Sequence, residues 1–270
     1  MTLELIADPA DPRIADYREA LDGHPRRRDE LFLVEGRLVI RRLLDTSRFR
    51  VRSLLATPRA LDDLRQVLTD RPSLTVYEAS TETLRAIVGF KFHRGCLALA
   101  ERGRPAAVAD VVAATGPRLV LALDELADPD NVGTIFRNAA AFGAAGVLLS
   151  PGCADPLYRK AIRVSMGATL STPFARGEWG ATLSALRGAG YTLLALMPDP
   201  RAETIEAVAA RPRPARLALI LGAEGAGLSP EARAAADLHV RIPMAPGVDS
   251  LNVATACGIA LHRLAASAVS

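Results

Sequence analysis

Three short segments in the second half of the sequence bring polar side chains and glycines to places where a ligand-binding site could form. They read DPDNVGTIFRNAA over residues 128–140, LILGAEGAGL over residues 219–228 and IPMAPGVDSLNVATA over residues 242–256. The first two come at the ends of apolar runs that are typical of buried strands. Ligands of open parallel α/β sheets bind outside the carboxyl ends of strands, so these segments are predicted to form one site.

The first segment combines an amide and a guanidinium on one predicted helix, which covers residues 131–142. Three residues near its start can cap it through side-chain oxygens: Asp128, Asp130 and Asn131. Gly133 and Arg137 are four positions apart and share a helical face, where the glycine leaves room for a substrate backbone. A plain helix cap and a solvated surface arginine are the alternatives for Asn131 and Arg137.

The second segment surrounds Glu224 with Gly222, Gly225 and Gly227. Glycines permit positive φ angles and let a backbone approach a ligand closely, although a tight structural turn would use them as well. Their order differs from the dinucleotide-binding fingerprint, and the segment lacks the lysine of a phosphate-binding P-loop.

The third segment starts with a predicted strand end at residues 242–244 and leads into a helix predicted over residues 251–266. Asp249 or Ser250 is the predicted N-cap of that helix, and the proline at the strand exit would end the sheet pairing. Three apolar side chains suit either a ligand slot or ordinary core packing: Ile242, Met244 and Leu251.

With 270 residues, half of them apolar, the chain is long enough to bury the cores of one large or two modest domains. No apolar run approaches the roughly 20 residues of a membrane-spanning helix, and the N-terminus lacks the features of a secretory signal. We therefore expect a cytoplasmic protein with no membrane partner.

The three cysteines and four histidines show no metal-ligand spacing, which predicts reduced, buried thiols and no metal site.

The charge pattern alone does not identify a partner. Residues 1–105 hold 19 Lys and Arg against 16 Asp and Glu, whereas residues 106–270 hold 14 of each. Nearly all the basic side chains are arginine, whose planar fork binds phosphate bidentately and stacks on bases. An excess this small would not indicate nucleic-acid binding without further motifs.

The sequence pattern predicts two α/β domains, residues 1–105 and 118–270, with a linker over residues 106–117 that has glycine and proline near both ends. In the first domain, strands are predicted over residues 31–35, 51–56, 74–77 and 95–100, and helices over residues 37–45 and 60–69. In the second, strands are predicted over residues 118–124, 146–150, 191–197 and 216–221, and helices over residues 131–142, 158–166 and 251–266. Apolar strands that alternate with helices predict a parallel sheet with helices on both faces.

In their order and spacing, the three segments resemble the SpoU/TrmH family of RNA ribose 2′-O-methyltransferases, within the SPOUT superfamily. The similarity covers most of residues 118–265. A weaker similarity over residues 25–105 includes FLVEGRLVI at residues 32–40 and His-Arg-Gly at residues 93–95. This part resembles the small RNA-binding domain of many members, with Arg94 in place of their usual glutamine. The resemblance implies S-adenosyl-L-methionine as cofactor and methyl transfer to a ribose 2′-hydroxyl of rRNA or tRNA, with rRNA favoured.

The resemblance also implies roles for individual residues. Those implicated in orienting and activating the ribose hydroxyl, or in holding the site together, are Asn131, Arg137, Glu224 and Asn252. Contacts to the cofactor are implied for Leu221, Gly222, Gly227, Ile242, Met244, Ser250 and Leu251. An arginine guanidinium stays protonated at neutral pH, so we expect Arg137 to bind phosphate or stabilise a developing alkoxide, with proton removal as the alternative.

The first domain supplies the candidate RNA contacts, for which a solvated basic surface is the alternative. These residues are Arg26, Arg27, Arg28, Arg37, Arg41, Arg42 and Arg94. Two departures from the family remove polar side chains that many members have, since Ala223 and Ala254 stand at those positions.

The resemblance further implies a deep trefoil knot between the second and third segments, contrary to the general rule for protein chains. It also implies a homodimer through the catalytic domain, in which Arg137 serves a shared site. Two other functions are open: a non-catalytic RNA-binding protein on the same scaffold, and base methylation by another SPOUT branch. The joint presence of the four catalytic candidates favours an enzyme, and the pairing of NVGxxxR with SLN favours ribose as the target.

Overall fold

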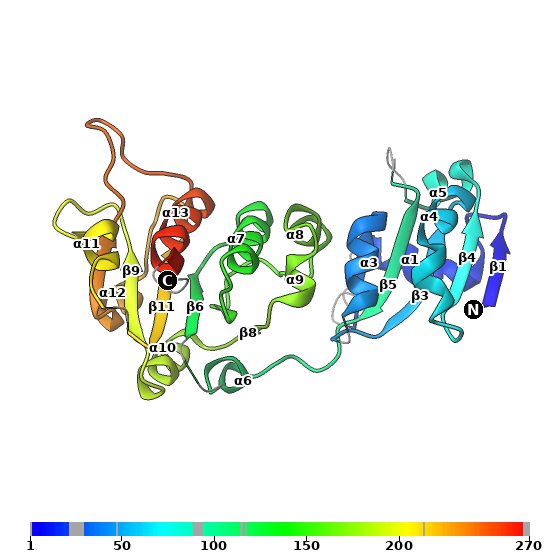
Figure 1. The fold of residues 1–270 in the computed structure, drawn as a ribbon. Coiled ribbons are helices and arrows are strands. Elements are labelled where there is room, and N and C mark those ends of the chain that lie inside the picture. The colour runs from blue at the N-terminus through cyan, green and yellow to red at the C-terminus, as the bar shows by residue number, and fades with distance from the viewer. Residues whose placement is uncertain are drawn as a thin grey trace. The chain divides into compact units, whose positions relative to one another are not determined.

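The chain folds into two compact units, each built around its own β-sheet (Figure 1). The computed structural model describes residues 2–21, 30–46, 48–88, 94–113, 116, 118–212 and 214–266. The first unit comprises Met1–Arg104 together with Leu157–Ser171, and the second comprises Pro105–Pro156 together with Thr172–Ser270.

The first unit contains a five-stranded mixed sheet in the order β1-β4-β3-β5-β2. Strands β1, β4 and β3 are parallel, and β5 runs antiparallel to both β3 and β2. In chain order its elements are β1 (Thr2–Ile6), η1 (Pro12–Ile14), α1 (Ala15–Leu21), β2 (Leu31–Glu35), α3 (Arg37–Asp45), β3 (Val51–Ala56), α4 (Pro58–Thr69), β4 (Thr75–Ala79), α5 (Thr81–Val88), β5 (Cys96–Glu101), α8 (Arg159–Val164) and α9 (Ala168–Ser171). One core of this unit gathers apolar residues of α1, α5 and the sheet around buried Tyr17, whose hydroxyl is hydrogen-bonded to Ser53 Oγ at 2.8 Å.

Helices α8 and α9 belong to the first unit although the sequence pattern places residues 158–166 in the second domain. Helix α8 packs against β2, and α9 packs against α3. The Arg42 guanidinium also donates a hydrogen bond to the Met166 carbonyl, between α8 and α9. This packing joins residues far apart in the sequence, so the pattern of apolar residues does not reveal it.

The second unit contains a seven-stranded sheet, parallel throughout, in the order β10-β12-β9-β11-β6-β7-β8. In chain order its elements are α6 (Val108–Val112), β6 (Arg118–Asp124), α7 (Pro129–Ala141), β7 (Gly146–Leu149), β8 (Phe174–Arg176), α10 (Trp179–Gly188), β9 (Thr192–Leu196), β10 (Glu203–Thr204), α11 (Ile205–Ala209), β11 (Arg216–Gly222), α12 (Pro230–Ala235), β12 (Leu238–Arg241) and α13 (Val253–Ala266).

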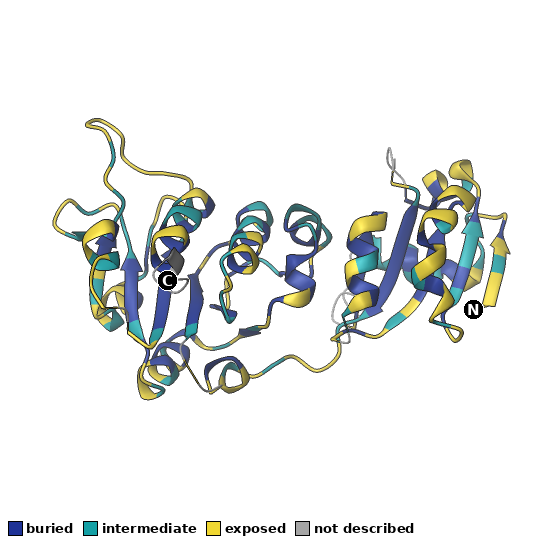
Figure 2. Cartoon of the chain, in the orientation of Figure 1, coloured by how far each residue is buried: buried dark blue, intermediate teal, exposed yellow. Residues whose placement is uncertain are grey.

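Helices cover both faces of this sheet, as the sequence predicts. Val120 and Ala122 of β6 share a core with side chains from α6, α10 and α12 on one face. On the other face, α7 and α13 contact each other and strands β7 and β11. Strand β6 lies between β11 and β7 and is buried from Leu119 onward, which explains its uninterrupted apolar sequence. Figure 2 shows this contrast between buried strands and exposed connections.

Three details of the second unit differ from the sequence predictions. Residues 106–117, expected as a linker, contain α6, whose Val111 and Val112 are buried in the core. The strand end predicted at residues 242–244 is wrong, because β12 stops at Arg241; Pro243 has no N–H with which to extend the ladder. Helix α13 begins at Val253, two residues later than predicted.

Candidate functional site

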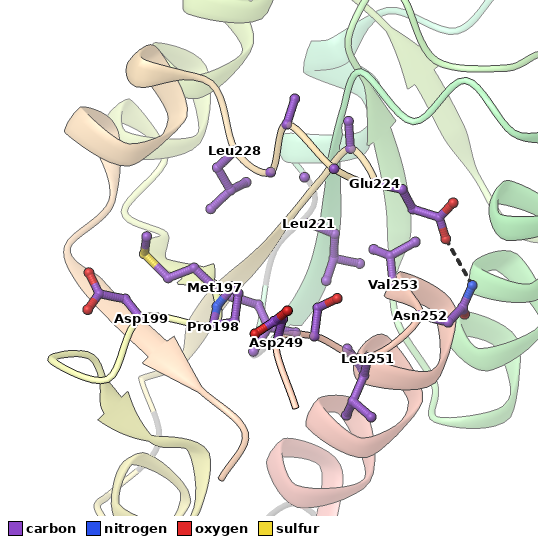
Figure 3. A pocket seen from close by; sticks show the side chains of 18 of the residues that line it. Met197, Pro198, Asp199, Leu221, Glu224, Leu228, Asp249, Leu251, Asn252 and Val253 are labelled. Carbon is purple, nitrogen blue, oxygen red and sulfur yellow. Dashed lines mark hydrogen bonds between the residues drawn. The ribbon is translucent and has the colours of Figure 1, made fainter. Parts of the chain in front are cut away.

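A cavity of about 690 Å³ lies at the carboxyl ends of three neighbouring strands of the second unit, β12, β9 and β11. The chain that leaves each strand contributes to its walls: residues 196–199 after β9, residues 221–228 at the end of β11, and residues 242–253 after β12. Figure 3 shows their side chains around the hollow. The second and third predicted segments therefore meet in one site, at the expected edge of the sheet.

The turn after β11 is a tight loop closed on itself. The Ala223 amide donates to the Gly227 carbonyl at 3.1 Å, and the Gly227 amide donates to the Ala223 carbonyl at 2.9 Å. A Cβ at Gly222 would lie 2.4 to 2.6 Å from backbone atoms of Gly227 and Leu228, closer than real contacts allow. Gly225 and Gly227 have φ angles of +81° and +70°, which favour glycine. The glycines predicted from the sequence thus shape a cavity wall made mainly of backbone.

A buried carboxylate anchors the far end of this turn. Asp124, the last residue of β6, is 1% exposed and pairs in register with Gly222. Its Oδ2 atom accepts a hydrogen bond of 2.7 Å from the Ser229 amide, where α12 begins. Asp124 is not among the residues predicted for the site, although an acidic residue at the end of an apolar strand was a signal for it. A charge-assisted bond of this kind holds both ends of the turn against β6.

Asn252 connects the three segments. Its Oδ1 atom accepts hydrogen bonds from the amides of Ala254 and Thr255, at 3.0 and 3.1 Å. That arrangement directs Nδ2 away from the helix start. Nδ2 then donates to Asn131 Oδ1 at 2.9 Å and to Glu224 Oε1 at 3.0 Å. The bond to Glu224 is the dashed line in Figure 3. Three of the four predicted catalytic residues therefore lie together: Glu224 and Asn252 line the cavity, and Asn131 lies behind them, bonded to Asn252.

The N-cap of α13 is Asn252, so the predicted cap at Asp249 or Ser250 is wrong. Both of those residues are exposed in the loop before the helix, where they line the cavity. Either would be a good cap by residue type. Asn252 takes the position because its amide group also joins Asn131 and Glu224.

Asn131 lies within the first turn of α7 and is 5% exposed. Of the three possible caps, the structure selects Asp128, which accepts from the Asp130 amide at 2.9 Å. Asn131 instead accepts a hydrogen bond from Asn252, just before α13. Asn138 lies on the same face of α7, two turns later, and its Nδ2 donates to the Ala254 carbonyl at 2.8 Å. Helix α7 is thus fixed to the start of α13 at two points.

Arg137 is not brought to this cavity. It lies six positions after Asn131, which places it about 120° around the helix from the face that meets α13. The side chain is exposed, and no residue in the described part of the chain forms a hydrogen bond or ion pair with it. Gly133 is buried whereas Arg137 is exposed, so the predicted open face with room for a substrate backbone at Gly133 is wrong, and neither residue lines the cavity.

All the predicted cofactor contacts line the cavity: Leu221, Gly222, Gly227, Ile242, Met244, Ser250 and Leu251. One wall lies outside the predicted set of residues: Met197, Pro198 and Asp199 after β9, together with Arg233 of α12. A signal for that wall was present, because residues 197–199 lie at the carboxyl end of the strand predicted over residues 191–197.

The predicted RNA contacts fall into separate groups. Arg26, Arg27 and Arg28 lie outside the described residues. Arg37 and Arg41 of α3 both bind Asp63, through its carboxylate and its carbonyl oxygen respectively. Arg94 lies 4.0 Å from the carboxylate of Glu35.

The described residues contain no group of three or more His, Cys, Asp or Glu that could hold a metal ion. The three cysteines are free and buried, and burial raises the pKa of the Cys96 thiol to about 12. None of the helices in the described ranges is long and apolar enough to cross a membrane.

Comparison with known proteins gives consistent matches. The family model of the SpoU rRNA methylases matches residues 118–262. An uncharacterized tRNA/rRNA methyltransferase of Mycobacterium bovis is 42% identical over 264 residues, which are 96% of this chain and 90% of that protein. The 23S rRNA (guanosine-2′-O-)-methyltransferase RlmB of Vibrio cholerae is 30% identical, over 81% of this chain and 89% of its own.

Solved structures agree over nearly the whole chain. An AdoMet-bound rRNA methyltransferase of Sinorhizobium meliloti superposes with a TM-score of 0.84 at 26% identity, covering 99% of both chains. The SpoU methyltransferase AviRb of Streptomyces viridochromogenes, in complex with AdoMet, has a TM-score of 0.81 at 25% identity, covering 96% of this chain and 99% of its own.

Proposed function

We propose that this chain, which belongs to the SpoU rRNA methylase family, transfers a methyl group from S-adenosylmethionine (AdoMet) to a ribose 2′-hydroxyl of rRNA or tRNA, with rRNA favoured. The observation that carries the proposal is the joining of Asn131, Glu224 and Asn252 at the rim of the cavity. The similarity to RlmB, whose name specifies a 2′-O-methylated guanosine in 23S rRNA, supports ribose over base as the target.

The cavity fits AdoMet in size, surface and charge. Gly222 is part of the lining, and Leu221, Ile242, Met244 and Leu251 supply an apolar wall for adenine. Gly227 and Ser250 complete the proposed contacts. Three carboxylates line the cavity against one arginine: Asp199, Glu224 and Asp249 against Arg233. A net negative lining favours a ligand that carries a sulfonium and an ammonium group.

When bound, AdoMet supplies a methyl group on a sulfonium, so that positioning of the attacking oxygen provides much of the rate. The role of the chain is to hold the ribose hydroxyl and to receive its proton. Asn252 binds Oε1 of Glu224 and so fixes the direction of that carboxylate, whose second oxygen is available as an acceptor at the rim. Asn131 in turn fixes the amide group of Asn252.

We further propose that Arg137 acts at a site shared between two copies of the chain, in a homodimer formed through the catalytic domain. The support is its position, exposed and away from the cavity of its own chain. A protonated guanidinium there would bind the phosphate next to the target ribose or stabilise the developing alkoxide.

The proposed trefoil knot involves the same cavity walls. The turn over residues 222–228 is held to Asp124, and the chain passes this turn again along residues 249–253 before α13 packs on α7 and β11. Threading of the chain through this turn would place backbone from both segments around the cofactor. Tracing residues 219–256 in a crystal structure tests the path.

The test is methyl transfer from radiolabelled AdoMet to bulk rRNA and to bulk tRNA, followed by digestion to nucleosides. We expect label in a 2′-O-methylnucleoside, and a loss of at least about 100-fold in Arg137→Ala. Arg65→Ala is the matched control, because Arg65 is an arginine on the surface of α4 with a 79% exposed side chain. A labelled base would instead indicate a base methyltransferase, and absence of AdoMet binding would leave only the RNA-binding scaffold.

A mixing experiment tests the shared site separately. Arg137→Ala and Asn252→Ala chains are each expected to be inactive. If the site is shared, the mixture regains about a quarter of the wild-type activity, since half of the randomly formed dimers are mixed and each of these has one intact site of two. If each site lies within a single chain, mixing restores nothing.

A further inference from the structure

One cation lies among the carboxylates in the lining of the cavity. Arg233 belongs to α12, which follows the turn over residues 222–228. The other charged residues in the described lining are Asp199, Glu224 and Asp249. Because like charges repel, the part of the wall at Arg233 is where an anionic group of a ligand would be attracted.

Main-chain contacts fix the position of Arg233. Its amide donates to the Ser229 carbonyl at 3.1 Å, and its carbonyl oxygen lies 3.1 Å from Nε2 of His239 in β12. Ser229 is the N-cap of α12, and its amide donates to the buried carboxylate of Asp124. The backbone of Arg233 therefore has the same support as the turn.

The guanidinium of Arg233 lies beside the last residues of the turn. Its Nε donates to the Leu228 carbonyl at 2.9 Å, and its Nη2 lies 3.7 Å from the place where a Cβ of Gly227 would be. Figure 3 shows Leu228 on one side of the hollow and Glu224 on another, directed toward Asn252. Arg233 is thus at the end of the turn away from the predicted reacting groups.

Most donors of this guanidinium are unused. A guanidinium carries five N–H donors, and the bond to the Leu228 carbonyl uses the one on Nε. Nη1 and Nη2 form no hydrogen bond with a described residue, and no described Asp or Glu oxygen lies within 4.0 Å of them. Arg211 of the same unit differs, since both of its Nη atoms donate to Glu203. The exposed side chain of Arg233 therefore presents a planar edge with free donors beside the cavity.

We propose that Arg233 binds the carboxylate of the methionine part of AdoMet and so sets the direction of the ligand along the turn. The proposal rests on the proposed function, in that AdoMet is the ligand of the cavity. AdoMet has one carboxylate, and the fork of an arginine binds a carboxylate bidentately. A carboxylate held at this end leaves the sulfonium for the end of the turn where Glu224 and Asn252 lie.

Calorimetric titration of the full chain with three ligands tests the contact. AdoMet and S-adenosylhomocysteine both have the carboxylate, whereas decarboxylated AdoMet keeps the adenosine, sulfonium and ammonium groups without it. The variants are Arg233→Ala and Arg233→Met; the methionine keeps an apolar stem, so that lost packing is separated from lost charge. Arg211→Ala is the matched control, an arginine with a 53% exposed side chain outside the cavity lining. Melting temperatures verify that each chain is folded.

Both Arg233 variants should bind AdoMet at least about tenfold more weakly, the usual loss for a hydrogen bond between charged groups. Binding of S-adenosylhomocysteine should fall by the same factor, because its carboxylate is the same. Binding of decarboxylated AdoMet should not weaken, since that ligand has no carboxylate to lose and its two positive charges are no longer repelled by Arg233. Arg211→Ala should bind all three ligands as the wild-type chain does.

Three results would overturn the contact. Equal weakening of AdoMet and decarboxylated AdoMet would mean that Arg233 only shapes the cavity. Wild-type AdoMet affinity in folded Arg233→Ala and Arg233→Met would remove the contact altogether. Weaker binding of poly(U) with unchanged AdoMet affinity would assign Arg233 to an RNA phosphate instead.

Failure of the proposed function would look different. If the wild-type chain bound neither AdoMet nor decarboxylated AdoMet, the cavity would not be a cofactor site, and the assignment of Arg233 would fail with it. A wild-type chain that binds AdoMet, together with Arg233 variants that bind it equally well, would overturn the contact at Arg233 alone.

Discussion

Replacing Gly222 by alanine tests whether the cavity depends on close backbone packing in the turn after β11. The added Cβ would lie 2.4 Å from the carbonyl carbon of Gly227 and 2.5 Å from the amide nitrogen of Leu228. Ordinary contact begins at 3.4 Å, so one side must move by about 1 Å. Both sides are backbone and cannot yield by changing a rotamer.

The turn has little freedom to make that movement. It is closed by two hydrogen bonds between Ala223 and Gly227 and held to β6 through the Ser229 amide and Asp124. Overpacking in a closely packed region costs about 1–3 kcal/mol of stability. A displacement of about 1 Å in the wall of a catalytic site can cost about 100-fold in rate.

Calorimetric titration with AdoMet and thermal melting measure the two effects. Gly222→Ala should weaken AdoMet binding at least about tenfold and lower the melting temperature by about 2–4 °C for each kcal/mol lost. Gly188→Ala is the neutral control, since a Cβ there meets nothing within 4 Å and its φ is negative. Gly225→Ala isolates backbone strain, because its surroundings are open but its φ is +81°. Wild-type affinity and melting temperature in Gly222→Ala would refute the reasoning.

Asn252→Ala removes the cap of α13, so it should lose about 1 kcal/mol of stability and should abolish methyl transfer. Asn252→Asp keeps the cap, so we expect it to regain the melting temperature but not the activity. If Asn252→Asp regained both, the role of the Asn252–Glu224 contact would be contradicted. Asp124→Ala should cost about 1–3 kcal/mol and weaken AdoMet binding, because the Ser229 amide loses its acceptor; an unchanged melting curve would argue against this anchor. The pKa of each thiol is raised by burial, to about 12 for Cys96, so the thiolate is scarce well below that pH and appears only as pH rises toward it. A disulfide reagent at pH 8 should therefore react slowly with the folded chain and rapidly with three thiols in urea, and rapid reaction of any thiol in the folded chain would contradict their burial.

Much of the fold follows from local pattern. The predicted strands at residues 31–35, 51–56 and 118–124 and the helix at residues 37–45 have the observed bounds. Their apolar residues follow the strand or helix period, and turn or cap residues mark their ends. Strand β10 has only two residues, too few to show a period. Strand β1 lies at a sheet edge, where Leu3 and Leu5 are exposed, so its alternation does not mark a buried face.

The local sequence pattern does not show which of two residues of similar type makes a given contact in the fold. Ser250 and Asn252 are both good caps, and only the contacts of Asn252 with Asn131 and Glu224 decide between them. The packing of α8 on β2 is fixed by tertiary contacts with Glu35, a residue distant in sequence. The direction of Arg137 likewise depends on which face of α7 meets α13.

We propose the cavity between the second and third segments as the AdoMet site, with Asn252 joining the reacting groups at its rim. A crystal structure of the chain with S-adenosylhomocysteine, the product that remains after methyl transfer, tests this most directly. We predict the ligand between residues 221–228 and 249–253, with its sulfur on the side of Glu224 and Asn252. A ligand bound elsewhere, or with its sulfur turned away from these residues, would contradict the account.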